Sequence, residues 1–250
     1  ERDFLDFAGG SVVHINAGVA ALVAAMYMGS RKGFPESPML PHNLTMSVTG
    51  AGMLWVGWFG FNAGSAVAAG NDAGMAMLVT HISAAAGSLG WMAMEWIRYR
   101  KPSVLGIVTG MVAGLGTITP ASGNVGPLGA LVIGISAGIV CYFATQYIKR
   151  VLKIDDSLDV FPVHGVGGVL GTMLVGVFAF KLGGAAPEGV TMSEQLIVQA
   201  LGVLATIIYC AVVSFIILKV IDLIIGLRVS PEEENEGLDH VCHDETGYNL

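Results

Sequence analysis

The segment Asp6-Phe-Ala-Gly-Gly-Ser-Val-Val-His14 opens a long apolar run with an acid, two glycines and one histidine. A second segment, Asp159-Val-Phe-Pro-Val-His164-Gly-Val-Gly-Gly168, opens another apolar run with the same kinds of residue. An ionisable side chain in a membrane-spanning run is costly and usually faces a cavity or the interior of a helix bundle. The apolar runs that the two segments open therefore predict membrane-spanning segments. Their two histidines predict a site that faces a cavity or the interior of the bundle.

The composition indicates a lipid environment for most of the chain. Only 12% of the 250 residues are charged, whereas soluble domains carry about 25% charged residues. The chain holds 35 glycines, which suits helices that pack closely in a membrane. The net charge of −7 comes mainly from the last 20 residues, and no basic patch lies outside short loops. Nucleic-acid binding is therefore excluded as a function.

Seven apolar runs reach the length of about 20 residues that a spanning helix needs, and strand-like alternation is absent. The sequence predicts an all-α polytopic membrane protein with a transmembrane domain at residues 1–228 and a tail at 229–250. The last run is too long to stand upright and should tilt or project from the bilayer. The spans are expected at about 7–29, 43–67, 72–97, 103–120, 124–148, 161–182 and 193–226.

Basic residues alternate between the loops and set the orientation. Every second loop carries them, at Arg31 and Lys32, at Arg98, Arg100 and Lys101, at Lys149, Arg150 and Lys153, and at Arg228. Basic loops face the cytoplasm. We therefore expect a chain that starts outside the cell membrane, crosses it seven times and ends in a cytoplasmic tail.

The runs at 7–29 and 161–182 then enter from opposite sides, which is typical of an inverted-topology repeat with its site near the midplane. Five helices separate the two equivalent runs, so four helices are expected before Glu1. Asp6 and Asp159 either cap their helices or make the site more negative. Pro162 fits a first helical turn.

The histidines lie deep enough to meet. His14 follows Asp6 by eight residues, about 12 Å along a helix, and His164 follows Asp159 by five residues, about 7 Å. A histidine can stay neutral, donating from one ring nitrogen and accepting at the other. The alternatives are a packing hydrogen bond, haem ligation or a metal site, although Gly165 and its neighbours favour tight helix contact over a haem. His42 and His81 are expected at the membrane interfaces.

One face of the 43–67 run carries Trp58, Phe61 and Ser65, at positions i, i+3 and i+7. Aromatic faces attract cations, and a serine oxygen can accept a hydrogen bond from an N–H donor. The face is thus either a cation site at the outer mouth or part of an interfacial aromatic belt.

Three motifs together resemble the signature of the ammonium transporter (Amt/Mep) family. They are Asp6-Phe-Ala-Gly-Gly-x-Val-Val-His14-Ile-Asn-Ala, Gly57-Trp-Phe-Gly-Phe61-Asn-Ala-Gly-Ser65 and Asp159-Val-Phe-x-Val-His164-Gly. The resemblance runs over the whole chain and implies an eleven-helix, inverted-repeat fold, of which this chain would hold the fifth to eleventh helices. It also implies a homotrimer with one narrow apolar pore in each subunit.

The resemblance further assigns roles to single residues. His14 and His164 match a hydrogen-bonded twin-histidine pair in the pore, and Phe61 matches a gating phenylalanine. Ser65 matches an outer residue that helps to bind ammonium, and Asp6 matches an aspartate that organises the outer site without touching the ion. The pore wall would include Leu54, Trp58 and Val160.

The tail segment Glu236-Gly-Leu-Asp239 also resembles the family, in which the tail packs on a neighbouring subunit and couples to a P-II-type nitrogen sensor in many bacterial members. His243-Asp-Glu-Thr-Gly-Tyr248 departs from the more usual His-Gly-Glu. The resemblance therefore supports conduction more firmly than regulation.

These features predict a transporter of ammonium, with methylammonium as an analogue, which is not an enzyme and holds no cofactor. Moving a bare cation through about 30 Å of hydrocarbon is prohibitive, so we expect ammonium to lose its proton near the gate and ammonia to pass the histidines. The rival functions are an ammonium sensor that signals through the tail, a Rhesus-type ammonia or carbon dioxide channel, and a membrane haem or metal enzyme. Growth on limiting ammonium would separate a transporter from a sensor.

Overall fold

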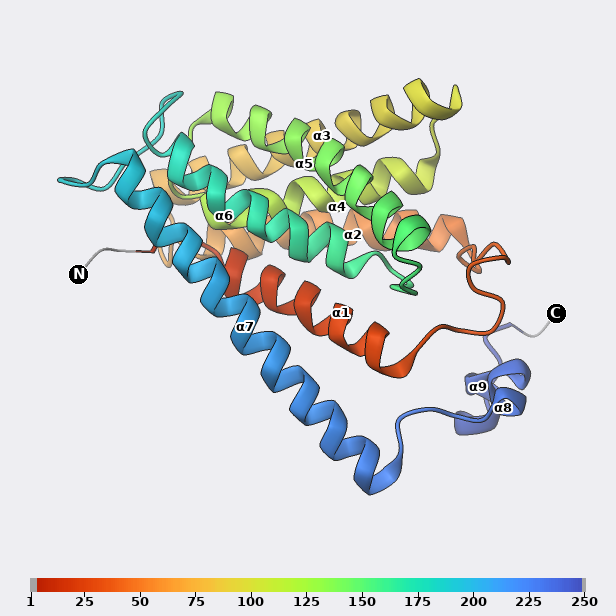
Figure 1. Ribbon diagram of the computed structural model, residues 1–250. Helices are drawn as coiled ribbons and strands as arrows, with labels where there is room; N and C mark the ends of the chain where they lie inside the picture. Colours follow the sequence, from red (N-terminus) through yellow and green to blue (C-terminus); the bar gives the residue numbers. More distant parts are fainter. Residues whose placement is uncertain (1–3, 249–250) are drawn as a thin grey trace.

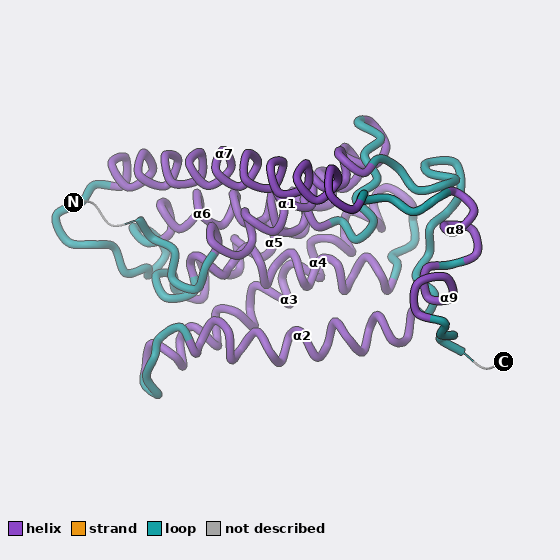
Figure 2. Tube along the Cα trace, turned by 90° about the horizontal axis from the view of Figure 1, so that it is seen from below, coloured by secondary structure: helices purple, strands orange, loops and turns teal. Residues whose placement is uncertain are grey.

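The computed structural model describes residues 4–248, and within them it contains helices and loops but no strand (Figures 1 and 2). Seven helices of the described chain are long and apolar enough to cross a membrane, which confirms the predicted all-α membrane class. The predicted ends at residues 1–3 and 249–250 lie outside the described residues. The spans are η1 with α1 (Gly10–Ile15, Asn16–Met28), α2 (Leu44–Gly64), α3 (Asn71–Tyr99), α4 with η2 (Val104–Ile118, Thr119–Ala121), α5 with η3 (Pro127–Gln146, Tyr147–Val151), η4 with α6 (Phe161–Val166, Gly167–Phe178) and α7 (Met192–Ile225).

The helices begin and end within a few residues of the predicted limits, and the largest difference has a local cause. The run expected at 161–182 stops being helical at Phe178. Leu182 and Gly183 follow with φ of 52° and 78°, a left-handed conformation that cannot continue an α-helix. The apolar residues after Phe178 therefore belong to the loop that leads to α7.

The longest helix, α7, crosses the others obliquely (Figure 1). This matches the expectation that a helix as long as this one, with 34 residues, tilts or projects. Two short helices follow it in the tail, α8 (Pro231–Glu236) and α9 (Leu238–His243). Figure 1 shows them at the same end of the molecule as the loop between α1 and α2.

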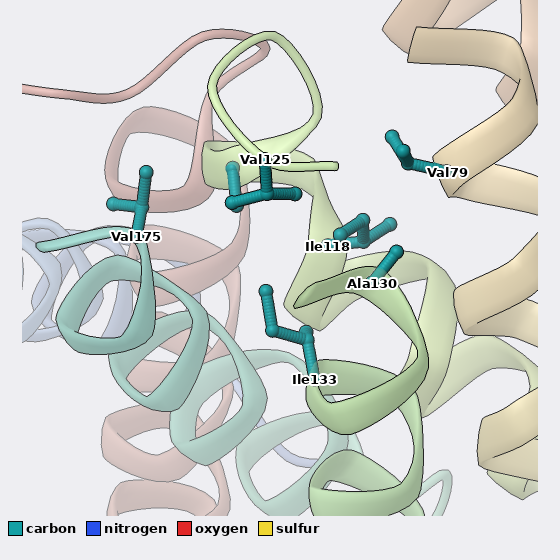
Figure 3. Close-up of a cluster of buried hydrophobic side chains, with 7 residues drawn as sticks. Val79, Ile118, Val125, Ala130, Ile133 and Val175 are labelled. Carbon is teal, nitrogen blue, oxygen red and sulfur yellow. The ribbon is translucent and has the colours of Figure 1, made fainter. Parts of the chain in front are cut away.

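A cluster of buried aliphatic side chains holds the helices together near the α4–α5 turn (Figure 3). It joins α3, α4, α5 and α6, and its members are Val79, Ile118, Ala121, Val125, Ala130, Ile133 and Val175. Glycines let the same helices approach closely, since a Cβ at Gly138 would overlap the carbonyl oxygen of Gly87. The bundle is thus a rigid support for the helices that carry the histidines.

The helices α1 and η4–α6 cross with their backbones in contact. A Cβ on Gly18 would overlap the backbone of Gly165, and a Cβ on Gly168 would lie 3.0 Å from Ile15 Cγ1. Small residues at such a crossing let membrane helices approach more closely than larger side chains allow. The predicted tight contact at Gly165 and Gly168 is therefore confirmed.

A buried glutamine fixes the chain just before η1. The Gln199 side chain of α7 accepts from the Leu5 backbone N–H (2.9 Å) and donates to the Leu5 carbonyl oxygen (2.8 Å). Its amide also donates to the Thr172 carbonyl oxygen of α6 (3.0 Å). The side chain therefore links α6, α7 and the segment that carries Asp6.

The crossing predicts that Gly18→Ala destabilises the protein by about 1–3 kcal/mol, because the added methyl group overpacks a contact between two backbones. The expected result is a lower midpoint of thermal unfolding in detergent. The matched control is Gly129→Ala, whose Cβ would have its nearest neighbours at 3.4 Å, the Cβ atoms of Phe178 and Val125. Equal unfolding midpoints for the two variants would contradict the proposed contact.

Candidate pore site

Asp6 caps the first of the two histidine helices. The Asp6 carboxylate accepts hydrogen bonds from the backbone N–H of Gly10 and from that of Ser11, the latter at 2.9 Å. A carboxylate at this position satisfies N–H groups that lack partners within the helix and lies at its positive end. The capping interpretation of Asp6 is thus the one that the geometry shows.

The inner helix is capped by a different residue from the one expected. Asp156 accepts from the N–H of Val160 (3.0 Å) and from that of Phe161 (2.7 Å), whereas Asp159 accepts from neither. The prediction that Asp159 caps this helix is therefore wrong. Each histidine lies eight residues after its capping aspartate, so the repeat pairs Asp6 with Asp156. That equal spacing is the signal in the sequence that could have identified the inner cap.

Asp159 instead ends the preceding turn and forms an ion pair. Its φ is 57°, a left-handed conformation that aspartate tolerates better than most residues. Its carboxylate lies 2.8 Å from Lys149 Nζ. Burial raises the pKa of Asp159, and the Lys149 ammonium opposes that shift. Its role is therefore electrostatic, at the inner end of the helix that carries His164.

The two histidines meet in the middle of the bundle. His14 Nδ1 and His164 Nδ1 are 3.1 Å apart, and the two rings are nearly parallel, with centroids separated by 5.2 Å. His14 is buried and His164 is partly buried. A hydrogen bond between two Nδ1 atoms requires that one ring donates and the other accepts. The predicted pairing of His14 with His164 is therefore present in the structure.

Both histidines lie in short π-helical stretches, η1 and η4, which open spans that continue as α-helices. Such stretches frequently occur at functional sites. The histidines are 150 residues apart, as are the capping aspartates, Asp6 and Asp156. The two antiparallel segments therefore relate to each other by an approximate two-fold axis that passes through the histidine pair.

An aromatic ring from α2 covers the pair. Trp58 stacks on His14 with ring centroids 5.4 Å apart, and Phe61 meets the same imidazole edge-on at 6.3 Å. Trp58 Nε1 donates to Thr119 Oγ1 (2.9 Å), and that hydroxyl donates to the Leu115 carbonyl oxygen (2.8 Å). These bonds fix the indole against the imidazole. The sequence analysis missed Thr119, which no motif marks.

The pair lies between two cavities, and His164 lines both. One cavity, of 810 Å³, is bounded by apolar residues of α1 and α2 and includes His14, Leu54, Trp58 and Phe61. The other, of 490 Å³, reaches the inner loops and includes Asp159, Lys149 and Arg31. The structure thus brings together the histidines and three of the predicted wall and gate residues.

Ser65 and Val160, like the two predicted aspartates, lie outside the 810 Å³ cavity. Ser65 follows the last residue of α2, and its hydroxyl donates to the Phe61 carbonyl oxygen (2.9 Å). Val160 immediately precedes η4, where its N–H bonds to Asp156. Ser65 is therefore at the C-terminal end of the aromatic face of α2, and Val160 is at the start of the helix that carries His164.

A family model described as the Ammonium Transporter Family matches residues 2–248. The chain belongs to the ammonium transporter family. Similar relatives include the ammonium transporter of Aquifex aeolicus, 47% identical over 98% of this chain, and Amt1 of Archaeoglobus fulgidus, 48% identical over 98% of it. The matches cover 57% and 62% of those two proteins, so the chain spans less than two thirds of their length.

Solved structures in the ammonium transporter family share this fold. A protein described as Sensor Amt Protein superposes with a TM-score of 0.88 at 35% identity, over 97% of this chain and 60% of the other. Mep2 of Candida albicans superposes with a TM-score of 0.83 at 36% identity, over 92% of this chain and 53% of the other. The relatives are transporters by name, so the family is one of transporters rather than enzymes.

The inner loops are held by an arginine fork. Arg31 donates to Asp155 from Nε (2.8 Å), from Nη2 (2.6 Å) and from its backbone N–H (2.8 Å). These hydrogen bonds keep the pKa of the Asp155 carboxyl below its usual range. Because Asp155 precedes Asp156, the fork connects the α1–α2 loop to the cap of the His164 helix.

The other histidines lie away from the pair. His81 of α3 lies beside Trp55 (5.1 Å between centroids) and Phe59 (5.9 Å), exposed on the surface of the described chain. His42 lies near Tyr248 of the tail, with ring centroids 5.7 Å apart. Neither lines the cavities that contain His14 or His164.

The two inner aspartates predict different effects on stability. Asp156→Ala removes two charge-assisted hydrogen bonds to backbone N–H groups and should cost about 1–2 kcal/mol, while Asp156→Asn keeps an acceptor and should cost less. Asp159→Asn should have the smallest effect, since that residue caps nothing. The midpoint of thermal unfolding measures all three, and a larger loss for Asp159→Asn than for Asp156→Ala would refute the assignment of the cap.

The arginine fork predicts a pH dependence. Because the folded-state pKa of Asp155 is lowered, the stabilisation is present above its unfolded pKa, near about 3.9, and is lost as the pH falls through the folded value. Arg31→Gln should remove about 1 kcal/mol at neutral pH, a small value because the guanidinium is 43% exposed. Unfolding midpoints at pH 7 and at about pH 2, well below the unfolded pKa, measure this: the gap between native protein and variant should narrow at the lower pH. An unchanged gap would show that Asp155 is not the group involved.

Proposed function

We propose that this chain conducts ammonium nitrogen across the cell membrane, as part of a pore in which His14 and His164 form the central pair. The observation that carries the proposal is the hydrogen-bonded pair itself, which lies between an apolar cavity and a cavity that opens to the inner loops. Two ionisable rings in a membrane bundle are expensive, so a use for them is expected. The names of the relatives supply the substrate.

The outer end of α2 is proposed to recruit the cation. The Ser65 hydroxyl donates a hydrogen bond to the Phe61 carbonyl oxygen, so its oxygen lone pairs remain to accept a hydrogen bond from an ammonium N–H. The ring of Phe61 lies one helical turn deeper and offers a π face to the same cation. The same ring is proposed to be the gate. Asp6 stays bonded to the N–H groups of η1 and acts on the ion through its charge.

The cation is then proposed to transfer its proton to water at the outer mouth, so that neutral ammonia reaches the histidines. Ammonia passes along the apolar wall formed by Leu54, Trp58 and Val13 at a far lower desolvation cost than a bare ion. His14 Nε2 is buried and has no hydrogen-bond partner within residues 4–248, so it remains to bond the permeant molecule. Potassium has no proton to release, which accounts for selectivity.

The described helices form one wall of this pore. Leu54 beside the 810 Å³ cavity is 54% exposed, and Val12 of η1 is 70% exposed. We propose that the facing wall comes from four further helices, in keeping with the greater length of the relatives. The complete protein is proposed to be a homotrimer in the cell membrane.

The tail is proposed to be cytoplasmic and to bind a P-II-type regulator. Figure 1 shows the tail at the same end as the basic α1–α2 and α5–α6 loops, as the charge rule requires. Glu234 of α8 accepts from the Lys32 backbone N–H (2.7 Å) and pairs with Arg228 (3.1 Å). A partner that binds α8 would therefore also act on the α1–α2 loop.

A sensor is the second candidate, because the structural neighbour described as Sensor Amt Protein covers nearly the whole chain and the tail contacts an inner loop. Growth of a transport-deficient strain on limiting ammonium separates the two. Rescue supports the transporter, and failure of a well-expressed protein supports the sensor.

The pair is tested by His14→Ala and His164→Ala in the native protein, with methylammonium uptake and the accompanying current measured in proteoliposomes. Both variants should lose uptake at least tenfold or lose selectivity over potassium, because the apolar wall then lacks its hydrogen-bonding groups. His81→Ala is the matched control, a membrane histidine outside the cavities, and should leave uptake unchanged. Normal uptake and selectivity in both pair variants would end the role proposed for them, and the current shows whether the proton follows the ammonia.

A further inference from the structure

The histidine pair rests against a residue without a side chain. A Cβ built on Gly116 of α4 would lie 3.8 Å from His14 Nδ1 and 3.8 Å from His164 Nδ1. Gly116 is buried, and it is equally distant from the two nitrogens that share the hydrogen bond. The position therefore faces the shared proton directly and lies near the two-fold axis.

No third polar group is bonded to the two Nδ1 atoms in the described chain; each bonds only to the other. The indole of Trp58 covers the face of His14, and Phe61 covers its edge. The nearest carboxylate along the His164 helix is Asp159, which is paired with Lys149, and Asp156 is engaged with backbone N–H groups. The proton between the rings can therefore reside only on His14 Nδ1 or on His164 Nδ1.

Hydroxyl groups are close at hand on the same helix, yet they point elsewhere. Thr119 Oγ1 bonds Trp58 and the Leu115 carbonyl oxygen. Thr117 Oγ1 lies against α6, since it would be 2.9 Å from a Cβ on Gly167. In the segment Gly116-Thr117-Ile118-Thr119, both hydroxyls thus point away from the histidines, and the residue that faces them, Gly116, carries no donor or acceptor on a side chain.

We propose that Gly116 is a positioning residue that keeps any third hydrogen-bonding group away from the Nδ1–Nδ1 bond. With only one proton between the two Nδ1 atoms, one ring carries its proton on Nδ1 and leaves Nε2 bare, while the other carries its proton on Nε2. The permeant molecule then always meets one Nε2 acceptor and one Nε2–H donor. This inference deepens the proposed function and rests on it.

A serine at this position would break the constraint without overfilling the space. A Cβ at 3.8 Å makes ordinary van der Waals contact, so Gly116→Ala is accommodated. The serine Oγ lies one bond further and can come within about 2.7–3.2 Å of either Nδ1. A hydroxyl can both donate and accept, so each ring gains a second partner and the two tautomers no longer depend on each other.

The test compares the Gly116→Ser, Gly116→Ala and Gly116→Cys variants with the unsubstituted protein, all in proteoliposomes. Cysteine is larger than serine but forms only weak hydrogen bonds, so the cysteine variant controls for the size of the added side chain. Gly116→Ala and Gly116→Cys should take up methylammonium within twofold of the native rate with the same pH profile. Gly116→Ser should lose uptake at least tenfold or shift its pH profile, at an unchanged midpoint of thermal unfolding.

A second measurement does not depend on transport. In protein labelled with ¹⁵N-histidine, the ring-nitrogen signals of the pair, identified by their loss in His14→Ala and His164→Ala, should show one Nδ1–H and one Nε2–H tautomer in the native protein and in Gly116→Ala. In Gly116→Ser they should show a mixture.

Native tautomers in Gly116→Ser, or a transport defect that is equal in the alanine, cysteine and serine variants, would overturn the inference. Normal uptake in His14→Ala and His164→Ala would overturn the proposed function instead, and the tautomer measurement would still decide on Gly116.

Discussion

The close crossing of α1 with η4 and α6 is the constraint on which the rest of the structure depends. Backbone contact between Gly18 and Gly165 sets the separation of the two helices, and that separation places the two imidazoles at hydrogen-bond distance. A bulkier crossing would leave two polar rings apart in an apolar bundle, each without its partner and each costly. The histidine pair is thus a product of the glycines as much as of the histidines.

The arrangement of helices was readable from the sequence because a membrane makes the relevant quantities simple. Run length gave the seven spans, and their ends moved by a few residues, the most at the end of α6, ahead of the left-handed Leu182. The antiparallel repeat and the meeting of His14 with His164 also followed from the order of residues. These features depend on hydropathy and spacing, which a one-dimensional pattern contains.

The parts that were missed depend on the direction in which side chains point. Three acids precede His164, and only the eight-residue spacing that Asp156 shares with Asp6 tells which of them caps: Asp156 does, while Asp159 pairs with Lys149. Thr119 reaches Trp58 across an interface between α4 and α2, over 61 residues of sequence. The position of Gly116 beside the two histidines can be identified only from the three-dimensional arrangement of α4 against the pair.

The approximate two-fold axis through the histidine pair has a consequence for direction. In the proposed pore, a molecule that arrives from either side would meet the same kinds of group near the centre: a capped helix end, a π-helical turn and an imidazole. Such a centre would treat the two directions alike. Any preference for one direction would then arise at the unequal ends, where Ser65 lies at one and the Lys149–Asp159 pair at the other.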